Sequence, residues 1–563
     1  MKLKAQNSDQ KLRGGYYTPE ELADFIIRWA LHNEQSLRAF EPSCGDGVFL
    51  EALVKHPRFS QLNCVAVELD KEEAKKAKEK MQLYSNVEVL NKDFFSVYEH
   101  YKNDLSGKSQ GFDAIVGNPP YIRYQYLSSE QRVAQADILV TNGMKSNMLI
   151  NAWVSFVVAC VELLNDNGRI GMVIPAELLQ VAYAEDLRLF LINNLSSITV
   201  ITFEELVFPN VQQEVVLLLA EKDKEASSKS KSSIRLIELK NLDCLTERTL
   251  DLEPIEYQQA MKDKNKWTRY FLDIDETNLI YQIQMNNRFV AFSEIADVDI
   301  GITTGNNSYF SVSKALVDEY ELHDVTRPLI GRSSHASGLY FTDEDWKKNV
   351  NKGVDAYLID FPDTPYEHYP NLHRYYIELG EQEGANKGYK CSIRDRWYRV
   401  PSIWAPDAFF LRRNNMFPKF VLNDINAVST DTMHRIKFNE GLDRDKILLS
   451  YYNSITFAFT EIEGRSYGGG VLEILPGELE KIMLPNLQGM DARVVKDLLL
   501  KIDAAIRGNI DIEPVLDEVD KKVLIEFIGI DEKVVTTFRQ IWKKLMYRRL
   551  NRKRRSTKNS VVR

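Results

Sequence analysis

The sequence predicts a doubly wound α/β domain over residues 1–235, a larger α+β domain over residues 236–510 and a helical segment with a basic tail over residues 511–563. The prediction rests on a change of pattern along the chain and on its length. Strand-like and helical runs alternate at first, then strand-like pieces, glycine turns and aromatic residues follow without that alternation. A chain of 563 residues is also too long for one hydrophobic core.

The alternation in the first half is regular. Short apolar runs predict strands, longer runs with a period near 3.6 predict helices, and alternating elements of this kind form a mostly parallel sheet covered on both faces. The expected strands are 39–40, 64–69, 87–90, 112–116, 170–174 and 198–203, and the expected helices are 19–31, 48–54, 71–83, 147–164 and 177–191.

The end of this domain departs from the parallel pattern. A further strand over 214–220 follows the strand at 198–203 with no helix between them, and so short a connection predicts an antiparallel hairpin. The polar run 221–233 after it is expected to be a solvated loop or linker.

The composition is that of an ordinary globular protein, with 44% hydrophobic and 27% charged residues. The five cysteines are odd in number and never form a CxxC pair, which favours a reduced, cytoplasmic setting without a zinc knuckle. No secretory signal opens the chain, and the apolar stretch 150–164 is interrupted by polar residues, so we expect a buried helix there and no membrane span.

The net charge of −9 argues against nucleic acid as a partner when it is averaged over the chain. Binding depends on where cations gather, however, and basic residues cluster at 387–413 and 543–558.

Polar residues follow three successive strands of the expected sheet. A glycine turn, Glu41-Pro42-Ser43-Cys44-Gly45-Asp46-Gly47, follows the first, Glu68 ends the second, and Asp93-Phe94 follows the third. An acidic residue at a strand end can bind ribose hydroxyls, so the arrangement favours a nucleoside ligand. In the alternative, the carboxylates are solvated caps and Phe94 is a core residue.

The fourth strand ends in the stiff turn Asn118-Pro119-Pro120-Tyr121. Two prolines remove two backbone donors and fix two φ angles, so this segment belongs neither in a helix nor in a central strand. A rigid polar turn at a strand end can hold a small planar group, although an ordinary strand-terminal turn is the simpler alternative.

Together these motifs resemble the gamma class of S-adenosylmethionine-dependent DNA adenine-N6 methyltransferases, to which the TaqI enzyme belongs. Gly15-Tyr16-Tyr17-Thr18-Pro19 is similar to the amino-terminal cofactor motif of that class, and residues 168–175 are similar to its fifth-strand motif. Phe208 falls where the class has an aromatic that stacks on the target base. The resemblance covers about the first 225 residues and implies a Rossmann-like methyltransferase sheet.

The resemblance also implies roles for single residues. The implied catalytic residues are Asn118, Pro119, Pro120, Tyr121 and Phe208. The implied S-adenosyl-L-methionine contacts are Tyr17, Thr18, Pro19, Glu41, Ser43, Cys44, Gly45, Glu68, Leu69, Asp93, Phe94 and Asn118. We expect no nucleophilic role for Cys44, because a cysteine nucleophile serves methylation of cytosine carbon 5, and we interpret it as a small packing residue.

The implied chemistry is a direct methyl transfer to the exocyclic amine of an extruded adenine. The Asn118 side-chain oxygen and the Pro119 carbonyl would accept hydrogen bonds from the amine and expose its lone pair. Tyr121 and Phe208 would stack on the two faces of the base. No metal is expected.

The second half is expected to recognise duplex DNA. The stretch 390–401 interleaves cations with aromatic residues, and the candidate DNA contacts are Arg394, Arg396, Trp397, Tyr398, Arg412 and Arg413. The alternative is a surface strand whose arginines form ion pairs. Residues 301–306, 452–454 and 465–470 are similar to framework stretches of target-recognition domains in this class. The run 548–555 is either a solvated tail or a phosphate contact.

These inferences predict a sequence-specific DNA adenine-N6 methyltransferase of a restriction-modification or phage-defence system. Its expected partners are double-stranded DNA and a separate restriction endonuclease or defence-system chain, with no membrane. Two alternatives stay open at this point: a modification subunit that needs partner chains, and a protein-glutamine or RNA N-methyltransferase, since those families also use Asn-Pro-Pro-Tyr.

Overall fold

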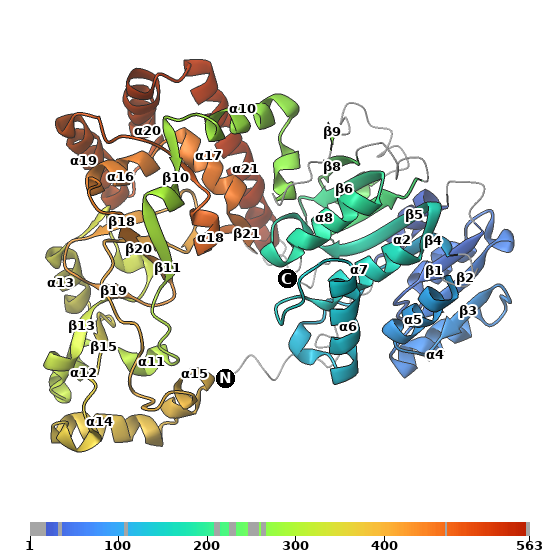
Figure 1. The fold of residues 1–563 in the computed structure, drawn as a ribbon, viewed down its shortest axis with the longest axis horizontal. Helices are drawn as coiled ribbons and strands as arrows, with labels where there is room; N and C mark the ends of the chain where they lie inside the picture. Colours follow the sequence, from blue (N-terminus) through green and yellow to red (C-terminus); the bar gives the residue numbers. More distant parts are fainter. Residues whose placement is uncertain are drawn as a thin grey trace. The chain divides into compact units, whose positions relative to one another are not determined.

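A nine-stranded sheet forms the centre of the first of two units (Figure 1). The computed structural model describes residues 18–31, 37–105, 111–205, 207, 214–223, 232–245, 258–259, 266–467 and 470–558. The first unit ends at Phe271 and the second begins at Leu272.

The strands of the sheet lie in the order β3-β2-β1-β4-β5-β7-β6-β8-β9. Their bounds are β1 Arg38–Glu41, β2 Asn63–Val67, β3 Val87–Leu90, β4 Phe112–Gly117, β5 Leu164–Pro175, β6 Ser197–Phe203, β7 Val215–Glu221, β8 Ser233–Leu239 and β9 Gln258–Gln259. The first five strands are parallel, whereas β7 runs antiparallel to both β5 and β6. The expected parallel sheet with a late antiparallel hairpin is therefore confirmed.

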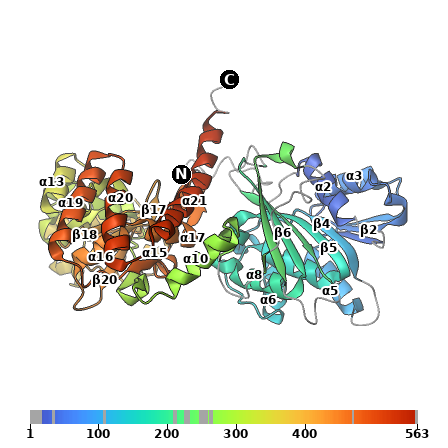
Figure 2. The same cartoon turned by 90° about the horizontal axis from the view of Figure 1, so that it is seen from above.

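Helices cover both faces of this sheet (Figure 2). Their bounds are α2 Glu20–Ala30, α3 Val48–Val54, α4 Lys71–Met81, α5 Phe94–Leu105, α6 Ser129–Thr141, α7 Ala152–Leu163 and α8 Glu185–Asn194. Helices α5, α7 and α8 bury apolar side chains against one face, and α2, α3 and α4 bury theirs against the other. This is the doubly wound arrangement that the alternation predicts.

Several elements of the first unit differ from the prediction, among them β8 and β9, which join the sheet beyond the last expected strand. The helix expected over 147–164 begins only at Ala152, and the one expected over 177–191 divides into η3 (Ala176–Leu179), η4 (Ala182–Ala184) and α8. Helices α5 and α6 were not predicted. The signal for α6 was nevertheless present, because Ser128 and Gln131 form a reciprocal capping box at its amino end.

The second unit is built from several small sheets and many helices, as expected for an α+β domain. Its sheets have the orders β11-β20-β16-β18-β14, β12-β15-β13-β19, β17-β22-β21 and β10-β23. The strands are β10 Phe289–Ala291, β11 Ala296–Ile300, β12 Ser311–Val312, β13 Thr326–Ile330, β14 Tyr340–Phe341, β15 Tyr357–Ile359, β16 Ala408–Leu411, β17 Arg413–Asn414, β18 Phe420–Asn423, β19 Val428–Ser429, β20 Met433–Phe438, β21 Arg465–Tyr467, β22 Val471–Glu473 and β23 Met483–Pro485.

Helices become more frequent toward the carboxyl end of this unit. They are α10 Ile274–Gln284, α11 Asn307–Phe310, α12 Lys314–Glu319, α13 Asp343–Asn351, α14 Asn371–Gln382, α15 Tyr389–Ser392, α16 Arg444–Tyr451, α17 Ser454–Glu463, α18 Pro476–Leu479, α19 Ala492–Gly508, α20 Glu513–Val519, the π-helix η13 Asp520–Ile528 and α21 Glu532–Lys558. The expected helical carboxyl-terminal segment is confirmed by α20, η13 and α21.

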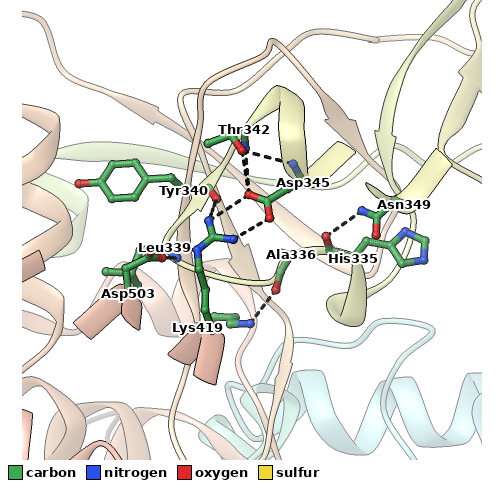
Figure 3. A network of polar contacts seen from close by, with 10 residues as sticks. His335, Ala336, Leu339, Tyr340, Thr342, Asp345, Asn349, Lys419 and Asp503 are labelled. Carbon is green, nitrogen blue, oxygen red and sulfur yellow. Dashed lines mark hydrogen bonds and ion pairs between the residues drawn. The ribbon is translucent and has the colours of Figure 1, made fainter. Parts of the chain in front are cut away.

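A polar network of the second unit includes Tyr340 and Asp345 (Figure 3). Arg507 of α19 bonds to both residues and so ties α19 to α13. The guanidinium donates to both carboxylate oxygens of Asp345, at 2.6 and 3.0 Å, and to the Tyr340 carbonyl at 3.0 Å. Burial alone would raise the pKa of Asp345, but its hydrogen bonds with Arg507 and Thr342, together with the charge of Arg507, outweigh that effect and the pKa is lowered. Asp345 therefore stays charged and holds α19 against α13.

Candidate active site

The strand order reverses between β1 and β4, and the Asn-Pro-Pro-Tyr turn lies at the carboxyl end of β4 at this point. The carboxyl ends of β1, β2 and β3 follow on the same edge because the four strands are parallel. In open α/β sheets ligands bind in the crevice at such a switch point. The fold thus brings the sequence motifs of the first domain to one edge.

Three segments far apart in the chain are joined at this edge by hydrogen bonds through Asn118. The Ser43 hydroxyl donates to the Asn118 carbonyl at 3.1 Å, and the Asn118 side-chain nitrogen donates to the Thr18 hydroxyl at 3.2 Å. The second bond turns Nδ2 toward Thr18, so that Oδ1 is the acceptor end of the amide. The glycine turn, the Thr-Pro segment and the Asn-Pro-Pro-Tyr turn thus form one hydrogen-bonded group.

The backbone before Asn118 is tightly packed. Gly117 has a φ of +156°, and a Cβ at this position would lie 3.3 Å from Cδ of Pro42. Pro119 is buried, and the Tyr121 hydroxyl donates to the Val173 carbonyl of β5 at 3.1 Å. The turn is therefore fixed from both sides, by the glycine turn after β1 and by β5.

Glu41, at the end of β1, is a buried carboxylate without a hydrogen-bond partner for either oxygen among the described residues. Its side chain is 1% exposed, and burial together with the nearby Glu68 and Asp46 raises its pKa well above the usual value. An unpartnered buried carboxyl is costly unless a ligand completes it. Glu41 therefore suits a cationic ligand group.

Glu68 lies directly across the glycine turn. Its carboxylate accepts the backbone N–H of Gly45 at 2.9 Å and that of Asp70 at 2.7 Å. Burial nevertheless raises the pKa of Glu68. A carboxylate offers about four acceptor positions, so these two bonds fix its orientation and leave capacity for a ligand hydroxyl.

The remaining predicted residues of this group differ in exposure. Gly45 has a φ of +54° and open space where a Cβ would stand, and Leu69 is 58% exposed at the same edge. Cys44 is buried, and burial raises the pKa of its thiol, so it stays protonated. These features agree with a packing role for Cys44, and its contact with a cofactor stays a prediction.

Asp93 and Phe94 both have contacts within the protein. The Asp93 carboxylate accepts the Phe95 backbone N–H at 2.9 Å at the start of α5, and the Gln131 side chain at 2.7 Å. Phe94 is 3% exposed and stacks on Phe156 with ring centroids 4.1 Å apart. The structure gives the pair capping and core roles, and their contact with a base stays a prediction. Gln131 is not among the predicted residues because the sequence pattern does not predict α6.

Two predicted residues, Tyr17 and Phe208, lie outside the described residues. Thr18 is buried next to Pro19, which precedes the first turn of α2.

In the second unit, each predicted DNA contact has partners within the protein. Arg394 donates to the Thr303 carbonyl at 3.0 Å, and Arg396 pairs with Asp363 at 2.7 Å. Arg412 and Arg413 both pair with Glu473, at 3.1 and 3.3 Å. The ion-paired alternative thus describes Arg396, Arg412 and Arg413, whereas Arg394 bonds to a backbone carbonyl. The contact of these arginines with DNA stays a prediction.

The two aromatic candidates of that stretch belong to an apolar cluster of the second unit. Tyr398 is 6% exposed, and Trp397 packs against Tyr309 and donates to Glu381 at 2.9 Å. Both rings therefore stabilise the domain interior, whatever contact they make with a ligand.

Within the described ranges, no cluster of three or more His, Cys, Asp or Glu side chains could hold a metal ion. None of the helices described is both long and apolar enough to span a bilayer.

Two family models match the chain in order. One, described as Eco57I restriction-modification methylase, matches residues 48–208, and the other, described as Type II methyltransferase M.Eco57I, C-terminal domain, matches residues 264–524. The first match lies within the first unit, and the second lies almost entirely within the second unit.

Curated relatives and a solved structure cover most of the chain. The Type II methyltransferase M.AccI of Acinetobacter calcoaceticus is 25% identical over 86% of this chain and 87% of its own length. M.XamI of Xanthomonas campestris pv. amaranthicola is 24% identical over 85% and 86%, respectively. The structure described as a DrdV-DNA complex has a TM-score of 0.50 at 11% identity and covers 91% of this chain and 59% of that one, which shows a similar fold. The resemblance to gamma-class DNA methyltransferases is confirmed.

Proposed function

We propose that this chain, a DNA methyltransferase of the Eco57I restriction-modification type, transfers a methyl group from S-adenosyl-L-methionine to the N6 amine of an extruded adenine in duplex DNA. The observation that carries the proposal is the group of hydrogen bonds by which Thr18, Ser43 and Asn118 meet at the switch point of the sheet. An asparagine amide fixed in this way is an acceptor aimed from a rigid turn.

The residues at this edge fit the proposed cofactor. Its methionine part carries a cationic ammonium beside a sulfonium, and Glu41 is a buried carboxyl without a protein partner. Its ribose carries hydroxyls, and Glu68 is an oriented acceptor at the end of β2. When bound, the cofactor supplies an electrophilic methyl group.

The chain's own residues would prepare the amine. Asn118 Oδ1 and the Pro119 carbonyl accept hydrogen bonds from the two N–H groups of the amine. These bonds withdraw the nitrogen lone pair from the ring and direct it outward. The packing of Gly117 against Pro42 and the bond from Tyr121 to Val173 keep these acceptors from turning away. Positioning and electrostatics therefore carry the rate.

We assign methyl transfer to the first unit and DNA recognition to the second, with the helical segment 511–563 at its carboxyl end. The expected boundary at residue 235 falls within β8 of the sheet, so we place the boundary after Phe271. The six candidate contacts, Arg394, Arg396, Trp397, Tyr398, Arg412 and Arg413, belong to this proposal. A separate restriction endonuclease is the proposed partner chain.

The direct test incubates the purified chain with isotopically labelled S-adenosylmethionine and plasmid DNA, followed by nucleoside mass spectrometry and sequencing of modified bases. We expect N6-methyladenine in a single sequence motif. Methyl-cytosine as the product, or label in RNA or protein instead of DNA, would contradict the proposal. Transfer that needs a second chain would support the modification-subunit alternative.

Cofactor binding is expected to release protons through Glu41. Because its pKa is raised in the free protein, the carboxyl holds a proton at pH values where an exposed glutamate is ionised, and an approaching cation lowers the pKa again. Calorimetric titration with S-adenosylmethionine in buffers of different ionisation enthalpy measures the protons released.

Glu41→Gln should remove this proton release and weaken cofactor binding roughly ten- to hundred-fold, the loss of one charge-assisted hydrogen bond. Glu51→Gln is the matched control, because Glu51 pairs with Lys80 on the surface at 3.1 Å. Undiminished proton release by the Glu41 variant would show that another group is responsible.

A further inference from the structure

Two adjacent large apolar side chains project into solvent from the connection between α6 and α7. Met148 is 77% exposed and Leu149 is 79% exposed, whereas the next residue, Ile150, is 4% exposed. Single exposed apolar residues are common, but a neighbouring pair beside a functional edge suggests a binding surface.

Hydrogen bonds fix the backbone that carries these two side chains. Asn147 accepts the backbone N–H of Leu149 through its side chain at 2.9 Å and that of Ile150 through its carbonyl at 3.3 Å. The Gln135 side chain of α6 donates to the Ile150 carbonyl at 3.3 Å. These bonds fix the backbone on both sides of the two exposed side chains, so their exposure is a property of the fold.

This projection lies close to the Asn-Pro-Pro-Tyr turn. The backbone N–H of Ala152 donates to the carbonyl of Ile122 at 2.9 Å, and Ile122 directly follows Tyr121. Three residues of chain span at most about 10 Å, so Leu149 lies within that distance of Ala152, which is hydrogen-bonded to the residue after the turn.

Cations flank the pair. Arg123, just after the turn, and Lys145, three residues before Met148, are exposed, and in the described part of the chain neither side chain has an ion-pair partner. The Lys145 backbone donates to Asp186 at 3.0 Å, which fixes this end of the connection. Such a surface suits DNA, because the cations can contact the phosphates while the apolar side chains contact the stacked bases.

We propose that Met148 and Leu149 form a wedge that enters the base stack of the DNA where the target adenine leaves it. Extrusion costs unstacking and unpairing energy and leaves a gap beside the unpaired partner base. An apolar side chain in that gap restores contact with the neighbouring bases and keeps the adenine from returning. The wedge rests on the proposed function and adds to it the side chains that hold the DNA duplex open.

The test compares the wild-type chain with the double variant Met148→Ala/Leu149→Ala on two duplexes that carry the motif found by sequencing. One duplex is fully paired, and the other has a mismatch opposite the target adenine, which lowers the cost of extrusion. On the paired duplex we expect kcat/KM to fall roughly ten- to hundred-fold. On the mismatched duplex the loss should shrink to a few-fold.

The matched control is Leu83→Ala. Leu83 is 85% exposed but lies in the connection from α4 to the amino end of β3, at the opposite edge of the sheet, so both duplexes should be methylated normally. Because all three side chains are exposed, the thermal midpoints of the variants should match that of the wild type.

The outcomes separate the wedge from the proposed function. An active wild type with an unaffected double variant, or with an equal loss on both duplexes, would overturn the wedge alone. A wild-type chain that methylates neither duplex would overturn the proposed function and the wedge with it.

Discussion

Asn118→Ala is expected to lower the rate of methyl transfer at least about a hundred- to thousand-fold, the cost of removing one preorganised polar group from a reaction centre. The substitution deletes the acceptor Oδ1 and leaves the Asn118 carbonyl, which accepts from Ser43 at 3.1 Å, in place. Cofactor binding should therefore stay within a few-fold. Single-turnover transfer of labelled methyl groups and calorimetric cofactor titration measure the two effects separately.

Thr18→Val is the matched control for this prediction. It removes the hydroxyl that accepts from the Asn118 amide at 3.2 Å but keeps the amide itself. A neutral hydrogen bond contributes about 0.5–1.5 kcal/mol, so the loss should be at most about tenfold. Appreciable turnover by Asn118→Ala, or equal losses in the two variants, would contradict a chemical role for Oδ1.

The parallel part of the sheet could be predicted because each strand is a short, nearly continuous apolar run, as parallel strands buried on both faces must be. The ends of helices are harder to predict where tertiary packing overrides the helical pattern of the sequence. Residues 147–151 continue the helical pattern of α7, yet the bond from Ala152 to Ile122 starts the helix at Ala152 and leaves Met148 and Leu149 outside it. A contact of this kind between distant segments is not visible in local sequence.

The candidate site was predictable only in part, for the same reason. The residues of the glycine turn and the Asn-Pro-Pro-Tyr turn could be predicted because strand ends in a parallel sheet share an edge. The partners that settle how each group is used are remote in sequence. Gln131 occupies one oxygen of Asp93, and Glu473 is shared by Arg412 and Arg413. Sequence spacing identified the charges but not their pairs.

Arg549→Met should destabilise the second unit by about 3–5 kcal/mol, the cost of leaving one member of a buried ion pair alone. Arg549 of α21 is 2% exposed, and its guanidinium donates to both oxygens of Glu461 in α17, at 3.1 and 2.6 Å. A third bond reaches the Gly470 carbonyl at 2.6 Å. Urea unfolding followed by circular dichroism and tryptophan fluorescence measures the loss, since Trp542 of α21 packs on Phe457 of α17 with ring centroids 5.1 Å apart.

Two further variants test whether the lost stability comes from the buried charge. Arg549→Met combined with Glu461→Leu should regain most of the lost free energy, because no buried charge remains. Arg493→Met should change the stability by less than about 0.5 kcal/mol, since Arg493 pairs with Asp491 on the surface. A double variant as unstable as the single one would show that packing of the arginine, and not its charge, is what α21 needs.

The pH dependence of the Arg549→Met penalty has a definite sign. Burial raises the pKa of Glu461, although Arg549 lowers it in part, so removal of Arg549 should raise this pKa further. A carboxyl whose pKa is raised by folding destabilises the folded state as the pH rises through that pKa, and is harmless below its unfolded pKa, where it is protonated in both states. The free-energy difference between wild type and Arg549→Met should thus be larger at pH 8 than at pH 5. A difference that stays constant between these two values would mean that Glu461 does not remain buried and unpaired in the variant.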